Sequence, residues 1–240
     1  MFETSSYRDA GLPGDTAAVV APDRLGLLCH EVMDGNFLCA VLFQVRPDLP
    51  VQVLHTRDDL DAWMSGVTPA ARLIAFCSGV VVPAAYLAVL GGQAYNFHPG
   101  TPDYPGRFPT AFARYDGAAL FGATLHQMAT RVDSGPIVGV VQSPVPPGSS
   151  YQWLAAKAHQ AALHLFLETV DALACSLAPL PPLSLSWGAR QCSLKALEQA
   201  CCLPNDISAE ELERRCGSFG QVLGAKLYVM LSGRRFELAA

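Results

Sequence analysis

The chain has 240 residues, of which 51% are apolar and 15% are charged, so it can bury a real core and extended disorder is excluded. The net charge is -5, and no clustered run of Lys and Arg exists to neutralise phosphates. Nucleic acid is therefore not an expected partner. No stretch reaches the roughly 18–20 continuous apolar residues of a membrane-spanning helix, and the polar start does not resemble a signal peptide. We expect no membrane association.

Eight cysteines are distributed along the chain, mostly inside apolar segments. None forms a C-x-x-C pair, which argues against a metal site and against a dense disulfide framework. We therefore expect buried, reduced thiols in a cytoplasmic protein that holds no metal. Disulfides and metal ligation are the alternatives.

The first half of the chain predicts short apolar strands that alternate with helices. Three helices are expected, from Asp23 to Gly35, from Thr56 to Met64 and from Pro83 to Gly91, because a capping residue or proline opens each one. Such alternation is typical of an α/β fold with a mostly parallel, Rossmann-like sheet and helices on both faces. The expected strands are residues 17–21, 37–45 (where a helix is the alternative), 51–54, 73–76 and 94–97.

The second half begins with a turn-rich stretch, residues 98–109, followed by expected strands at 122–128 and 137–142. Ser149 or Ser150 then caps a long amphipathic helix that extends to Leu173. A Pro-rich connector at 178–183 places a domain boundary, so residues 1–178 form the α/β domain and residues 179–240 a small C-terminal α+β region. That region is predicted to hold a helix at 208–215 and a β-hairpin made of 226–231 and 234–238.

Several familiar motifs are absent. There is no G-x-G-x-x-G after the first strand, no phosphate-binding G-x-x-x-x-G-K, no H-E-x-x-H and no G-x-S-x-G. Asp133-Ser134-Gly135 matches the tripeptide of aspartic proteases, in which two carboxylates share one proton. The chain has one copy of it, in a domain that is predicted to be α/β. We therefore do not expect a protease.

Asn96, His98 and Asp133 are the candidate catalytic residues. Asn96 and His98 are two positions apart where a strand leaves the sheet, so both side chains lie on one face, at the sheet edge where α/β proteins bind ligands. Asp133 lies on a second loop that can approach the same edge. An amide that binds an oxyanion, an imidazole that takes a proton and a carboxylate that orients it are what acyl transfer to an amine requires. The alternative is that Asn96 and His98 only satisfy loop backbone groups.

Four segments occur in an order and spacing that resemble the folate-dependent formyltransferase family. They are Asn96-x-His-Pro, Tyr104-Pro-Gly, Gly122-Ala-Thr-Leu-His126 and Val132-Asp-Ser-Gly-Pro-Ile-Val138. The family includes glycinamide ribonucleotide, methionyl-tRNA and amino-sugar N-formyltransferases. The resemblance implies that Asn96 binds the developing oxyanion, His98 assists removal of the amine proton, and Asp133 orients and charge-balances His98.

The resemblance also implies that 10-formyltetrahydrofolate is the co-substrate. An apolar loop that ends at Pro83 would line its pocket, and a second loop would close over the pterin, largely through backbone groups. His126 is expected to be a packed or supporting histidine rather than a member of the triad. The folate-binding residues expected on this basis are Gly79, Val80, Val81, Val82, Met128, Val132 and Asp133.

The sequence departs from the family at two places. Between His98 and Tyr104, residues 99–103 lack the family's usual Ser-Leu-Leu-Pro, and this segment is one residue shorter than in the family. Residues 17–22 replace the opening strand and glycine turn, which in the family help to receive a phosphorylated or nucleotide-linked acceptor. Residues 208–238 resemble the tRNA and sugar enzymes more than the ribonucleotide enzyme, but this tail is short and weakly charged. We therefore expect a small amine acceptor, such as an amino sugar.

Three other functions remain open at this point. They are a 10-formyltetrahydrofolate hydrolase on the same scaffold, a methionyl-tRNA formyltransferase-like enzyme and a non-catalytic folate-binding protein. The C-terminal hairpin is one surface through which a homodimer could form.

Overall fold

The computed structural model describes residues 3–5 and 20–238, and its centre is a seven-stranded sheet. The strand order is β1-β7-β6-β5-β4-β2-β3. The strands are β1 (Glu3–Ser5), β2 (Arg24–Cys29), β3 (Val51–Leu54), β4 (Ala71–Phe76), β5 (Ala94–His98), β6 (Leu120–Gln127) and β7 (Ile137–Pro144).

The sheet has a parallel half and an antiparallel half. Strands β3, β2, β4 and β5 pair in parallel, whereas β6, β7 and β1 continue the sheet with antiparallel pairings. The predicted α/β fold is confirmed, and β5 lies where the two halves meet. Strand β4 is buried at all six positions, as a central parallel strand that is covered on both faces should be.

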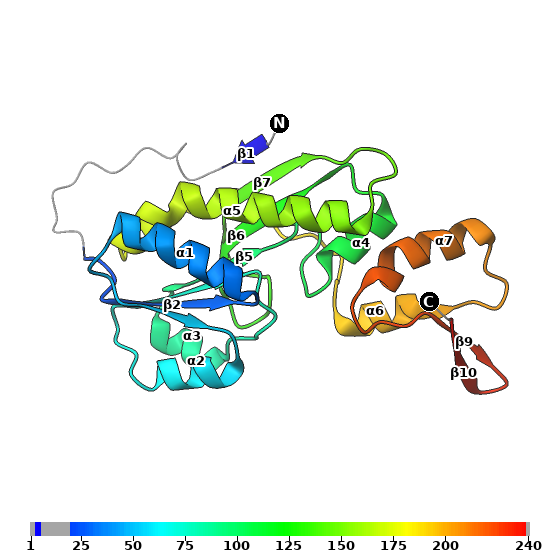
Figure 1. Cartoon of the computed structure of the whole chain (residues 1–240), viewed down its shortest axis with the longest axis horizontal. Helices are drawn as coiled ribbons and strands as arrows, with labels where there is room; N and C mark the ends of the chain where they lie inside the picture. Colours follow the sequence, from blue (N-terminus) through cyan, green and yellow to red (C-terminus); the bar gives the residue numbers. More distant parts are fainter. Residues whose placement is uncertain (1–2, 6–19, 239–240) are drawn as a thin grey trace.

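Helices cover both faces of the sheet (Figure 1). Helices α1 and α5 pack together on one face and enclose the main core with Leu38, Leu42, Leu165 and Phe166, while α2 and α3 cover the other face around Trp63. The helices of this domain are α1 (Val32–Val45), α2 (Arg57–Met64), α3 (Ala84–Leu90), α4 (Pro109–Asp116) and α5 (Tyr151–Cys175).

The helix starts predicted at Thr56 and Ser150 are confirmed by their side-chain caps. The Thr56 side chain accepts a hydrogen bond from the backbone N–H of Asp59, whose carboxylate accepts one from the backbone N–H of Thr56, which completes a capping box. Ser150 caps α5 by accepting from the backbone N–H of Trp153. These short polar side chains satisfy donors that the first helical turn would otherwise leave unpaired.

Two predicted elements near the start are wrong. Residues 24–29 form strand β2 instead of a helix, and helix α1 begins only at Val32 and continues to Val45, so the helix given as the alternative for 37–45 is the one observed. In β2 the side chains from Leu25 to Cys29 are buried on both faces, so its apolar run carries no alternation to distinguish it from a helix. Of the strand predicted at 17–21, residues 17–19 lie outside the described part and the rest is irregular.

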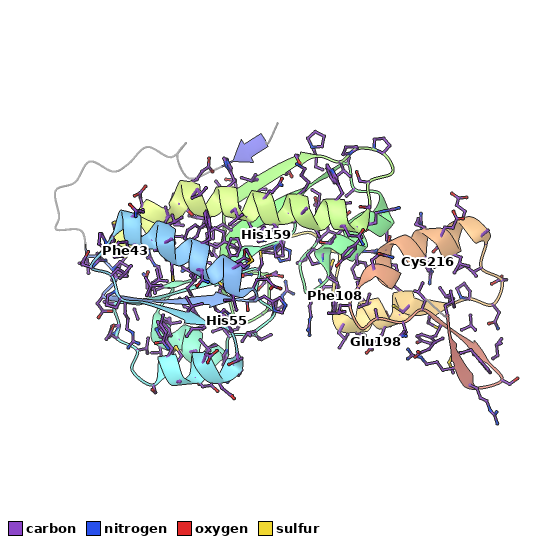
Figure 2. All side chains as sticks on the ribbon, in the orientation of Figure 1. Phe43, His55, Phe108, His159, Glu198 and Cys216 are labelled. Carbon is purple, nitrogen blue, oxygen red and sulfur yellow. The ribbon has the colours of Figure 1, made fainter. Side chains whose placement is uncertain are left out.

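The C-terminal region lies beside α4, to the right of the α/β domain in Figure 1. The rings of Phe219 and Phe112 are 5.1 Å apart, and Phe219 also contacts Tyr115, so an aromatic cluster joins this region to the α/β domain. In Figure 2, Phe108 lies near this junction, with Glu198 and Cys216 on the C-terminal side. The elements are α6 (Leu194–Cys201), β8 (Cys202–Leu203), α7 (Ala209–Ser218), the 3-10 turn η2 (Phe219–Gln221), β9 (Tyr228–Leu231) and β10 (Arg234–Glu237).

The predicted helix at 208–215 and the closing hairpin are confirmed, and the hairpin extends a small sheet of order β10-β9-β8. Helices α4 and α6 were not predicted. None of the helices in the described ranges is long and apolar enough to cross a bilayer.

Candidate active site

Strand pairing brings the candidate residues together. Asn96 lies in the middle of β5 and His98 at its last position, at the carboxyl edge of the parallel half. The antiparallel register with β6 places His126 directly opposite Asn96 and Thr124 opposite His98. The Thr124 hydroxyl donates to the Gly100 carbonyl at 2.8 Å and fixes the start of the loop that follows β5. The site therefore spans the boundary between the two halves of the sheet.

Asp133 lies at the centre of this cluster. Its Oδ2 accepts from the backbone N–H of Gly106 at 2.8 Å and is 3.3 Å from His98 Nδ1. Its Oδ1 is 3.1 Å from His126 Nε2 and accepts from Asn96 Nδ2 at 3.4 Å. The backbone of Asp133 has a φ of 44°, a left-handed conformation that few residues other than Gly adopt. Strain of this kind is often found at functional sites.

Burial and the neighbouring polar groups shift the pKa of the Asp133 carboxyl in opposite directions. Only 2% of the side chain is exposed, and burial alone would raise its pKa. The neighbouring His98, the hydrogen bond with His126 and the Gly106 N–H all favour the ionised form, and together they lower the pKa to about 2. Asp133 is therefore a fixed negative charge beneath the two imidazole rings.

His98 has an oxygen acceptor facing each ring nitrogen. Its Nε2 is 3.0 Å from the Tyr104 carbonyl, and its Nδ1 faces Asp133. A neutral ring can donate through only one nitrogen, so a second proton would complete both hydrogen bonds. Burial outweighs this attraction and lowers the pKa of His98 below its ordinary value, so the resting ring is neutral at pH 7. The neutral ring can act as a base, because the cation formed on protonation is stabilised by hydrogen bonds to Asp133 and the Tyr104 carbonyl.

His126 belongs to the same cluster, although only a packed or supporting role was predicted for it. It is buried, and its Nε2 is 3.1 Å from both Asp133 Oδ1 and Asn96 Nδ2. Its Nδ1 is 3.0 Å from the carbonyl of Gln127. Trp187 was not singled out at all, yet its ring lies 5.0 Å from that of His126 and 5.7 Å from that of His98.

A cavity of about 680 Å³ opens above the cluster. Asn96, His98 and Asp133 line its floor, which is the polar and convergent arrangement expected of a ligand site. All the residues that were expected to contact folate line the same cavity: Gly79, Val80, Val81, Val82, Met128, Val132 and Asp133. Among the described residues that line it, Asp133 is the one carboxylate, whereas Arg107 and Arg131 lie at its exposed rim.

Metal ligation is a separate question for a cluster with two imidazoles and a carboxylate. Within residues 20–238, no three His, Cys, Asp or Glu side chains are arranged to hold a metal ion. Asp133 instead has hydrogen-bonding partners on both oxygens.

The fold and the cluster define an α/β protein with an amide, imidazole and carboxylate site of the kind that acyl-transfer enzymes use. A family model described as formyl transferase matches residues 56–170, which contain every member of the cluster except Trp187. A methionyl-tRNA formyltransferase from Acidothermus cellulolyticus is 32% identical over 137 residues, which is 56% of this chain and 42% of that protein. Over residues 56–170, just under half of its length, the chain is therefore similar to the formyl transferase family.

Solved structures share the fold. A sugar N-formyltransferase from Shewanella superposes with a TM-score of 0.65 at 14% identity, over 90% of this chain and 96% of that one. The formyltransferase PseJ from Anoxybacillus kamchatkensis, in complex with a formamido sugar nucleotide and tetrahydrofolate, superposes with a TM-score of 0.55 at 18% identity, over 73% of this chain and 88% of that one. The chain spans about half the length of the curated relatives it matches.

Proposed function

We propose that this protein transfers a formyl group from 10-formyltetrahydrofolate to the amine of a small acceptor. The single observation that carries the proposal is the position of Asp133, which contacts Asn96, His98 and His126 at the floor of the cavity. The cluster lies inside the matched family segment. A related fold has been solved with tetrahydrofolate bound, which supports a folate co-substrate here.

The reaction needs a nucleophilic amine, a stabilised oxyanion and a proton acceptor. The amine nitrogen attacks the formyl carbon, whose oxygen gains negative charge that the Asn96 amide is placed to stabilise by donating a hydrogen bond. His98 takes the proton that the amine loses, and the resulting cation donates to both Asp133 and the Tyr104 carbonyl. The bond between the formyl carbon and N10 of the folate then breaks, and N10 is protonated. The products are a formamide and tetrahydrofolate.

His126 is a positioning residue in this scheme. Asn96 Nδ2 donates to Asp133 Oδ1 and lies 3.1 Å from His126 Nε2, so these two groups orient the amide while its second N–H stays available for the oxyanion. Because the positions pair directly across β5 and β6, His126 cannot move without disturbing Asn96. Replacement of His126 by Phe should therefore reduce kcat by misorienting the amide.

The negative charges at the start of α1 favour an acceptor that has no phosphate at this position. In a β-α unit, the helix start after the first strand is a common phosphate site because its free N–H groups and dipole favour anions. Here Glu31 occupies the N-cap position of α1 and Asp34 lies in its first turn. Two carboxylates at the helix start would repel a phosphate. This agrees with a small amine acceptor, for which an amino sugar is our preferred class.

The test is turnover of 10-formyltetrahydrofolate by the purified protein with a panel of amines, including amino sugars, followed by tetrahydrofolate formation. Amine-dependent turnover that is lost in His98→Ala supports the transferase. Turnover equal with and without amine would identify a hydrolase instead. Transfer to initiator methionyl-tRNA at a rate comparable with that of any small amine would overturn the small-acceptor assignment, and failure to bind folate would overturn the whole proposal.

A further inference from the structure

The connector after α5 crosses directly over the proposed active site. We call residues 183–192 the strap. Its start is fixed where the Leu183 N–H donates to the Ile137 carbonyl at 2.7 Å. Farther along, the Gly188 N–H donates to the Pro102 carbonyl at 2.9 Å, and the Cys192 N–H donates to the Pro105 carbonyl at 3.0 Å. The last two bonds attach the strap to the loop that follows His98.

Two glycines allow this close approach. A Cβ added to Gly188 would lie 2.8 Å from the Cα of Asp103, which is rigid backbone. On the opposite side, Gly106 has a φ of +116° and its added Cβ would lie 2.8 Å from the Cys192 carbonyl oxygen. The strap and the loop after His98 therefore touch along their backbones, with no room for solvent or a side chain at either point.

Trp187 is the one large side chain that the strap places over the histidines. Its ring meets the rings of His98 and His126 edge to face, at centroid distances of 5.7 and 5.0 Å and interplanar angles of 75° and 89°. Its indole N–H donates to the Gly135 carbonyl at 2.8 Å, within the turn that carries Asp133. The indole is thus held in one orientation and covers both imidazoles and the Asp133 turn together.

From this geometry we infer that Trp187 is a positioning residue that keeps water from the histidine pair, so that the formyl group passes to the amine rather than to water. The inference rests on the proposed function. Water competes with the amine for the same carbon: its oxygen bonds to the formyl carbon, the bond to N10 breaks, and formate and tetrahydrofolate result. A base that assists the amine would assist water equally well, so the site must exclude water by covering that base.

Removal of the indole should have two consequences. With Trp187→Ala, water gains access to the imidazoles, so formate release from 10-formyltetrahydrofolate without any amine should rise severalfold. The same access relieves the burial that lowers the pKa of His98, so this pKa should rise toward its ordinary value. Trp187→Phe retains an apolar ring and should keep formate release near the wild-type rate. Leu185→Ala, an exposed position on the same strap, is the matched control.

The experiment measures formate released from 10-formyltetrahydrofolate alone and, separately, the titration of the His98 ring protons by NMR, assigned with a His98→Asn variant. Faster release and a higher His98 pKa in Trp187→Ala, with the Trp187→Phe and Leu185→Ala proteins near wild type, support the inference. An unchanged His98 titration and unchanged release would overturn it. If the wild type neither transfers nor releases formyl groups, the proposed function fails, while the titration alone still decides whether Trp187 covers the pair.

Discussion

Asp133→Asn is the variant that tests the buried charge most sharply. The substitution keeps the size of the side chain and an oxygen that can accept from the Gly106 N–H, but it removes the negative charge shared by His98 and His126. The Asp133 pKa is about 2 in the folded protein, against 3.8 for an ordinary Asp. At 1.36 kcal/mol for each pKa unit, the ionised carboxylate contributes about 2 kcal/mol to the free energy of unfolding at neutral pH.

The sign of the pH dependence follows from the lowered pKa. The contribution is fully present above the unfolded-state value near 4, and it is lost as the pH falls toward the folded-state value near 2. In urea unfolding, the stability of the wild type relative to Asp133→Asn should therefore be about 2 kcal/mol greater above pH 4 than at pH 2, with the change falling between pH 4 and pH 2. Asp58→Asn, at an exposed carboxylate in the first turn of α2, is the control for a general charge effect. A difference between the wild type and Asp133→Asn that stays constant from pH 7 to pH 2 would refute the reasoning.

The remaining predictions concern the base, the Asp133 turn and a buried arginine. His98→Ala should lower kcat by roughly 100- to 10,000-fold, and wild-type kcat/KM should stay high below pH 6.5, because burial lowers the His98 pKa; a pH-rate profile measures both. Gly135→Ala should abolish turnover, because its Cβ would overlap the Gln127 carbonyl oxygen. Gly79→Ala meets no atom within 4 Å and should fold normally; circular dichroism and turnover compare the two variants. Arg72→Ala should lower Tm by roughly 10 °C, for a loss of about 3 kcal/mol, because the buried guanidinium donates to the carbonyls of Leu173 and Ser176 at the end of α5. An unchanged melting curve would contradict that role for Arg72.

Local signals in the sequence are sufficient to predict much of the fold. Thr56 and Ser150 cap helices with their own side chains, so those helix starts can be read from neighbouring residues. The β2 strand could not be predicted this way, because β2 is held in the sheet by pairing with β3 and β4, which are distant in sequence. Burial on both faces removes the alternation that distinguishes a strand. The boundary placed at residue 178 stays a prediction.

Only part of the candidate site could likewise be predicted from the sequence. Asn96 and His98 could be paired from sequence, because a spacing of two in a strand fixes a common face. The contact of His126 with Asn96 depends on the register between β5 and β6, which the intervening loop and α4 do not encode in any short pattern. Trp187 reaches the histidines only because backbone hydrogen bonds from Gly188 and Cys192 fix the strap over the loop. Tertiary contacts of this kind leave no periodic signal in the sequence.

The most direct test of formyl transfer follows the transferred carbon itself. The protein would be mixed with 10-formyltetrahydrofolate labelled with ¹³C in the formyl group and with each candidate amine, and the labelled carbon would be followed by NMR. The account predicts that the signal moves to a formamide of one amine, with little free formate, and that His98→Ala prevents this. Label that appears only as formate, whichever amine is present, or that remains on the folate with every amine, would contradict it.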